Sequence, residues 1–166
     1  MRELDVTDAL RDAWAEAVSA NRSRLLLVVS ADNCAGCDDL ARQLAAPEVE
    51  RLLATQAAVH VAKAGDLYDE PAGRVRIGHW TLESPGFPTT WIFAPDDEGG
   101  LTFTALILGP IPSAIPEAEL SAALAGTSAW PDEAAGAQVR VCAGPMCFVL
   151  QESNDFRAGF RIRLPA

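Results

Sequence analysis

Residues 25–37 read Leu-Leu-Leu-Val-Val-Ser-Ala-Asp-Asn-Cys-Ala-Gly-Cys, and this stretch joins an aliphatic run to a Cys-x-x-Cys pair. The aliphatic run has no polar face, which is typical of a strand buried on both sides of a sheet. Apolar residues then recur at Leu40 and Leu44, at the spacing of an amphipathic helix. The two cysteines therefore stand where a buried strand passes into a helix.

This position gives the two thiols different chemistry. The free amide groups of a first helical turn and the positive end of the helix dipole favour an anion, so Cys34 should ionise more readily than a free thiol. Residues three apart lie on the same helix face, close enough to form a disulfide. We therefore expect Cys34 to be the more exposed thiol and the nucleophile, and Cys37 to attack a mixed disulfide formed at Cys34.

Further elements follow from the same periodicities. Helices are expected over residues 7–20, 48–54 and 116–125, and a strand over 57–62. Residues 89–94 and 101–108 flank a turn-rich spacer and are expected to form an antiparallel hairpin. Within residues 65–85, Pro71 is interpreted as the start of a short helix that carries Val75, Ile77 and Trp80.

A second motif stands at Phe87-Pro88-Thr89, immediately before a predicted strand. Proline cannot donate a hydrogen bond to a sheet, so it belongs at the first position of a strand. We expect the Phe87–Pro88 bond to be cis and to bring this backbone against the helix that carries the two cysteines.

With these motifs in this order, residues 7–126 resemble the thioredoxin superfamily. The resemblance is greatest to thioredoxin-like proteins related to the carboxy-terminal domain of bacterial transmembrane thiol reductases. It implies an α/β thioredoxin-like fold, in which helices flank a central mixed sheet. It also implies that Cys34 is the nucleophile and Cys37 the resolving thiol. Phe87 and Pro88 would bind the substrate, and Lys63 would lie near the active site.

Two departures from the family pattern bear on the activity. Val28 stands where thioredoxins bury an acidic residue, the usual proton acceptor for the resolving thiol. Asp38 and Asp39 follow the motif where a lysine is frequent, and carboxylates near a developing thiolate oppose its ionisation. The expected function is that of a thiol–disulfide oxidoreductase that acts as a reductant or a weak exchanger. It needs no cofactor and no metal, only a protein or small-molecule disulfide as substrate and an electron donor.

The sequence after residue 126 differs in composition from the part before it. Residues 1–126 are expected to form the thioredoxin-like domain and residues 127–137 a linker. Residues 138–166 are expected to form a small β-meander of three strands that packs on the main domain, because about thirty residues cannot bury a core of their own. Cys142 and Cys147 flank a four-residue turn and can form a second disulfide. The alternative is two buried small side chains.

Composition limits the partners and the location. The 166 residues include 23 acidic and 13 basic side chains, a formal net charge of −10, which argues against nucleic acid or a membrane surface as partner. No apolar run approaches the roughly 20 residues needed to cross a bilayer. The first residues lack the pattern of a secretory signal. We expect a cytoplasmic protein, although the mature form of an exported protein would have the same sequence features.

Two other functions fit the same sequence. One is a redox-inactive thioredoxin-fold module that binds a partner or acts like a chaperone. The other is a zinc-binding protein with all four cysteines as ligands. His60 is interpreted as a structural residue of a strand, whereas His79 lies in the least regular segment, from which it could approach the two thiols.

Overall fold

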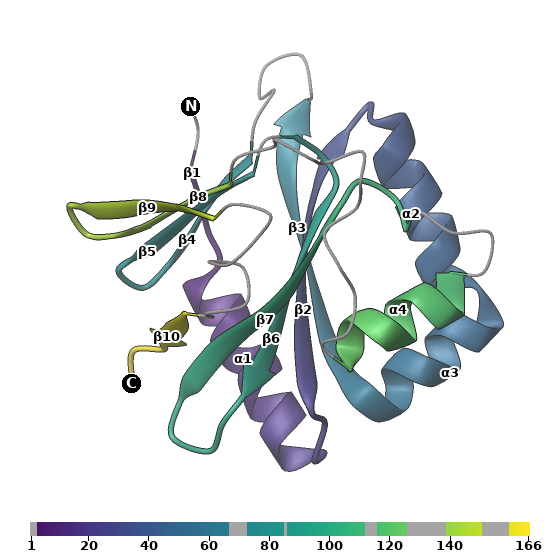
Figure 1. Ribbon diagram of the computed structural model, residues 1–166, viewed down its shortest axis with the longest axis horizontal. Coiled ribbons are helices and arrows are strands. Elements are labelled where there is room, and N and C mark those ends of the chain that lie inside the picture. Colours follow the sequence, from purple (N-terminus) through teal and green to yellow (C-terminus); the bar gives the residue numbers. More distant parts are fainter. Residues whose placement is uncertain (1–2, 67–72, 85, 112–115, 126–138, 151–159) are drawn as a thin grey trace.

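The computed structural model describes residues 3–66, 73–84, 86–111, 116–125, 139–150 and 160–166. These residues form four helices and two mixed five-stranded sheets, so the chain is a mixed α/β protein (Figure 1). In this part of the chain no helix is both long and apolar enough to cross a membrane.

The first sheet has the strand order β10-β7-β6-β2-β3. Strand β2 (Arg24–Asp32) lies beside β3 (Ala57–Asp66) in parallel and beside β6 (Thr89–Pro95) in antiparallel orientation. Strand β7 (Gly100–Leu108) completes the predicted hairpin with β6, and β10 (Arg161–Arg163) pairs with the outer side of β7. All residues of β2 from Leu25 to Ala31 are buried, which confirms the prediction of a strand covered on both faces.

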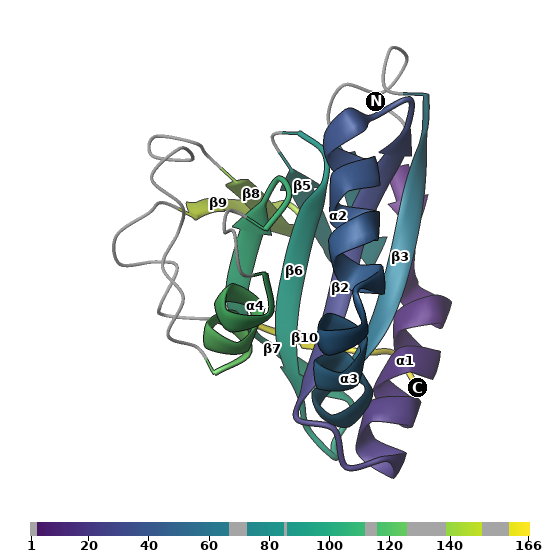
Figure 2. The same ribbon diagram turned by 90° about the vertical axis from the view of Figure 1, so that its right-hand side faces the viewer.

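Helices cover both faces of this sheet, as their apolar spacing predicts. Helix α1 (Thr7–Ser19) packs on the face that presents Leu25 and Leu27. Helices α2 (Ala35–Ala45), α3 (Pro47–Gln56) and α4 (Pro116–Leu124) pack on the opposite face, against Leu26 and Val28 (Figure 2). Four of the five predicted helices, those over residues 7–20, 48–54 and 116–125 and the one that carries Leu40 and Leu44, are thus confirmed.

The second sheet was not predicted. It has the order β1-β4-β5-β8-β9, from strands β1 (Glu3–Asp5), β4 (Gly73–Ile77), β5 (Trp80–Ser84), β8 (Val139–Ala143) and β9 (Met146–Leu150). The predicted helix carrying Val75, Ile77 and Trp80 is therefore wrong. Side chains alternate in β4 between the buried Val75 and Ile77 and the outward Arg74 and Arg76, which is the period of a strand.

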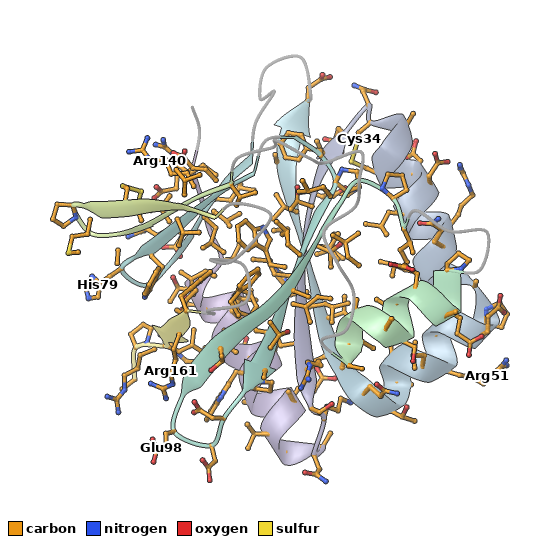
Figure 3. The ribbon with its side chains drawn as sticks, in the orientation of Figure 1. Cys34, Arg51, His79, Glu98, Arg140 and Arg161 are labelled. Atoms are coloured by element: carbon orange, nitrogen blue, oxygen red, sulfur yellow. A yellow bond between two sulfur atoms is a disulfide. The ribbon has the colours of Figure 1, made fainter. Side chains whose placement is uncertain are left out.

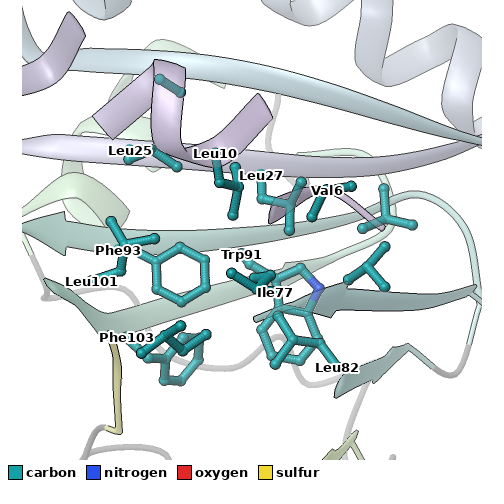
Figure 4. Close-up of a cluster of buried hydrophobic side chains, with 14 of the residues drawn as sticks. Val6, Leu10, Leu25, Leu27, Ile77, Leu82, Trp91, Phe93, Leu101 and Phe103 are labelled. Carbon is teal, nitrogen blue, oxygen red and sulfur yellow. The ribbon is translucent and has the colours of Figure 1, made fainter. Parts of the chain in front are cut away.

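The two sheets share a core with α1. The inner face of the second sheet presents aliphatic side chains to the aromatic residues of β6 and β7 (Figure 4); the buried residues at this contact include Val75, Ile77, Leu82, Val139, Val141, Trp91, Phe93 and Phe103. Leu10 of α1 lies in the same cluster. The second sheet thus occupies the same side of the first sheet as α1.

The predicted carboxy-terminal meander is divided between the two sheets. Strands β8 and β9 pair with each other, and β8 extends the second sheet through β5. Strand β10 joins the first sheet instead, where Phe160 stacks on Phe103 at a ring-centroid distance of 4.9 Å. The expectation of one three-stranded meander is therefore wrong, because β10 pairs with β7 and not with β9. The predicted linker, residues 127–137, lies outside the described residues.

Candidate functional site

Cys34 and Cys37 form a disulfide at the junction of β2 and α2, with their Cα atoms 5.2 Å apart. Cys34 is the N-cap residue of α2 and has an extended backbone. The backbone N–H of Cys37 points at the Cys34 sulfur, with 3.2 Å between N and Sγ. An amide donor of the first helical turn thus faces the atom that would carry the thiolate charge, as the motif's position predicts.

A hydrogen bond to the neighbouring strand β3 fixes the turn before α2. Asn33 has a positive φ of 53°, a conformation that asparagine adopts more readily than most residues. Its side-chain amide donates a hydrogen bond to the Asp66 carboxylate, at 2.5 Å. The end of β3 thereby fixes the approach of the chain to Cys34.

Both cysteines are buried in the disulfide form. Cys34 is 4% and Cys37 6% exposed, so the expectation that Cys34 is the more exposed of the two is wrong for this form. The pair lies in a small cluster with Ala31 and Ala64, and Leu4 of β1 and Phe87 pack against that cluster. Leu4 could not be recognised from the sequence, because β1 has only three residues and pairs with a distant strand.

Phe87 and Pro88 lie beside the disulfide. Their peptide bond is cis, as predicted, and the Phe87 carbonyl oxygen is 3.9 Å from Cys34 Sγ. The sulfur carries no proton in the disulfide, so this is a contact; a Cys34 thiol could donate to the same oxygen. A Cβ on Gly36 would lie 3.3 Å from Pro88 Cδ, which shows how closely the first turn of α2 packs against the proline.

A cavity of about 110 Å³ lies between α2 and β3, and Cys37 is part of its wall. The volume is enough for several water molecules. Val28 lines this cavity with only 3% of its surface exposed, so this position provides no buried carboxylate. Ser30, Asp38 and Lys63 are the polar side chains of the wall. Ser30 follows Val28 on the same face of β2, so strand alternation alone could have identified it.

The charges around the motif are solvated. Asp38 and Asp39 are exposed, and Asp39 forms an ion pair with Arg42 one turn further along α2. Lys63 pairs with Asp32 at 3.9 Å, and both side chains are more than half exposed. Water and salt screen such charges, so the two aspartates oppose ionisation of the thiol less than their position in the sequence suggests.

The histidines stand apart from the disulfide. His79 is exposed in the turn between β4 and β5, on a different part of the molecule from Cys34 (Figure 3), so the suggestion that it approaches the two thiols is wrong. His60 belongs to β3 and is half-buried, and burial lowers its pKa from the ordinary value of 6.5.

Cys142 and Cys147 form a second disulfide, between directly opposite residues of β8 and β9 with Cα atoms 4.0 Å apart. The alternative of two buried small side chains is wrong, because Cys147 is exposed and Cys142 half-buried. The four sulfurs are thus paired two by two. Within the described ranges no three histidine, cysteine, aspartate or glutamate side chains are grouped so that they could hold a metal ion.

Comparison with models of known protein families and with curated proteins finds no match for this sequence. The feature of this chain that indicates a function is its own site: a Cys-x-x-Cys disulfide at a strand-to-helix junction in a mixed α/β protein.

Proposed function

We propose that this protein is a thiol–disulfide oxidoreductase of the thioredoxin superfamily, with Cys34–Cys37 as its redox-active pair. The observation that carries the proposal is the position of Cys34 Sγ. It lies at the N-cap of α2, accepts from the Cys37 amide, and touches the residue before a cis-proline. Family membership is supported by the arrangement around it, in which β2 lies between β3 and the Pro88 strand and carries the motif at its end.

The proposed reaction transfers two electrons and needs no cofactor. The Cys34 thiolate attacks one sulfur of the substrate disulfide, and the other substrate sulfur leaves as a thiolate that takes a proton. Cys37 then loses its proton and attacks Cys34 Sγ, which releases the second substrate thiol and forms the Cys34–Cys37 disulfide. An external dithiol restores the reduced pair by the same steps in reverse.

The surroundings of the pair favour a reductant or a weak exchanger. The Cys37 amide and the helix dipole stabilise the Cys34 thiolate. Lys63, the cation of the cavity wall, is exposed and paired with Asp32, so it adds little to this stabilisation. Val28 provides no buried carboxylate beside Cys37, and Asp38, the carboxylate of the cavity wall, is exposed. The proton of Cys37 must therefore pass to water or to a polar group of the wall. Phe87 would pair its backbone with the substrate beside Cys34.

The test is trapping of the mixed disulfide. Cys37→Ser should accumulate a mixed disulfide at Cys34 with a disulfide substrate, whereas Cys34→Ser should form none. The matched control is Cys142→Ala with Cys147→Ala, which should reduce the same substrate at the rate of the unchanged protein. Disulfide reduction that survives loss of Cys34 in a chain that also carries Cys142→Ala and Cys147→Ala would contradict the assignment. A reduced pair that exchanges with no disulfide would favour the binding module instead.

A further inference from the structure

The disulfide Cys142–Cys147 lies on the outer face of the second sheet. In β8, Val139 and Val141 point into the core and are completely buried, so Arg140 and Cys142 point to the other face. Cys147 is the residue directly opposite Cys142 in β9 and shares this face. On the other side of β8, Cys142 is paired with Thr81 of β5, which also lies outside the core. Neither cysteine therefore contributes to the packing between the sheets.

The two disulfides differ in access. Cys34 and Cys37 are 4% and 6% exposed beneath Leu4 and Phe87, while Cys147 is exposed. The turn beside it is open as well, since Gly144 and Pro145 are exposed and Met146 has 75% of its surface accessible. A thiolate must reach a disulfide sulfur in line to displace the other, so access governs the rate of exchange.

The second disulfide restrains a hairpin that backbone pairing already holds together. Cys142 and Cys147 are five residues apart, and Ala143 already pairs with Met146 around the turn of Gly144 and Pro145. The backbone of the turn is fixed further by a hydrogen bond from the Gly144 amide to the His79 carbonyl, at 3.0 Å. A crosslink restrains the unfolded chain least when it closes a short loop. The hairpin and the packed core should therefore stay folded when this disulfide is reduced.

We propose that Cys142–Cys147 is a second thiol–disulfide exchange site, which small-molecule thiols attack directly at Cys147. The attacking thiolate forms a mixed disulfide with Cys147 Sγ, and the Cys142–Cys147 bond breaks to leave a Cys142 thiolate. A second thiol then attacks the mixed disulfide, so that two small thiols become one disulfide and the pair becomes a dithiol. This inference does not depend on the function proposed for Cys34 and Cys37.

Arg140 makes Cys142 the better leaving group. It lies two residues before Cys142 on the same face of β8, and its side chain is exposed beside the hairpin (Figure 3). A neighbouring cation stabilises a thiolate. Glu83 of β5 faces Arg140, but this carboxylate is already paired with Arg74. Attack at Cys147 with departure of Cys142 is therefore favoured by both access and charge.

The experiment uses the fully oxidised protein and reduced glutathione as the probe. Samples are quenched with acid at intervals, free thiols are blocked with N-ethylmaleimide, and the cysteine peptides are quantified by mass spectrometry. We expect Cys142 and Cys147 to become labelled at least about tenfold faster than Cys34 and Cys37. In the early samples glutathione should be bound to Cys147, with the maleimide on Cys142. Equal or faster labelling of Cys34 and Cys37, or glutathione mainly on Cys142, would overturn the proposal.

Two variants separate direct attack from transfer within the chain. Cys34→Ala with Cys37→Ala should leave the rate at Cys142–Cys147 unchanged within about twofold, whereas a large decrease would mean that electrons arrive through the first pair. Arg140→Gln should slow the reaction several-fold and weaken its dependence on salt. Arg51→Gln on α3, far from the hairpin, is the matched control and should have no effect (Figure 3).

Discussion

The Phe87 ring lies so close to Gly73 that a Cβ at Gly73 would stand 2.8 Å from its Cε1 atom. Gly73 begins β4 in the second sheet, and Phe87 precedes Pro88 beside Cys34. The same Cβ would also lie 3.0 Å from a methyl group of Val29 in β2. The absence of a side chain at Gly73 therefore lets the second sheet close over the first at the end where the disulfide lies.

Gly73→Ala should destabilise the protein and uncover Cys34. The added methyl group must displace the Phe87 ring or Val29, and overpacking of this kind costs about 1–3 kcal/mol of unfolding free energy. Phe87 is only partly buried, so its ring should move and alkylation of Cys34 in the reduced protein should be faster. Urea unfolding and timed alkylation measure the two effects. Gly65→Ala is the control, since a Cβ there meets nothing within 4 Å; equal behaviour of both variants would contradict the argument.

Much of the first sheet could be predicted because its signals are local. The aliphatic run of β2, the helical spacing around Leu40 and the Phe87–Pro88 motif each depend on a few neighbouring residues. The second sheet was missed for two reasons. Arg74, Val75, Arg76 and Ile77 alternate with the period of a strand, but Pro71 just before them favours a helix when the sequence is taken alone. The short β1 has no periodicity to detect.

Other features depend on contacts between distant parts of the chain. The pairing of β10 with β7 joins Arg161 to Thr102 across most of the carboxy-terminal half of the sequence. The burial of Cys34 likewise depends on Leu4, thirty positions earlier in the sequence. Neither contact leaves a signal in the residues near the motif, so no local pattern could predict them. By contrast, the second disulfide was foreseeable, because a short turn brings Cys142 and Cys147 together whatever the rest of the chain does.

Val28→Asp should supply a proton acceptor for Cys37. The new carboxylate would enter the cavity of about 110 Å³ that Cys37 and Lys63 line. If deprotonation of Cys37 limits the release of substrate, resolution of the mixed disulfide should be faster by about tenfold or more. The unfolding free energy should fall by about 1–3 kcal/mol or more, because a polar group replaces a buried methyl pair. Rapid-quench kinetics and urea unfolding measure these changes.

Val28→Asn is the matched control for that experiment. Its amide has nearly the same size as the carboxyl group and is also polar, but it accepts no proton. It should therefore lose stability without a gain in rate. An equal acceleration in both variants would show that the shape of the cavity, and not a proton acceptor, controls the reaction of Cys37.

His60 should make stability depend on pH below neutrality. Burial disfavours the imidazolium ion and lowers the His60 pKa below its ordinary value of 6.5, so the unfolded chain binds the proton more strongly. Stability is then highest above pH 6.5 and decreases as the pH falls below that value towards the lower pKa of the folded state. His60→Gln should flatten this part of the pH profile, measured by urea unfolding. His79→Gln, at the exposed turn between β4 and β5, should leave the profile unchanged; the reverse result would contradict the assignment.

Removal of the second disulfide should separate its structural contribution from the chemistry at Cys34. Cys142→Ala with Cys147→Ala should lower the unfolding free energy by about 2 kcal/mol at most, because the crosslink closes a loop of only a few residues. The inner face of β8 keeps Val139 and Val141 in the core, so the sheets should stay packed and the near-ultraviolet spectrum should be unchanged. Turnover at Cys34 with dithiothreitol as the reductant should also be unchanged. Unfolding of the double variant would show that the packing of the sheets needs this disulfide. If the variant instead stayed folded and lost the Cys34 reaction, the hairpin would be part of the redox machinery, and the two disulfides could not act as separate sites.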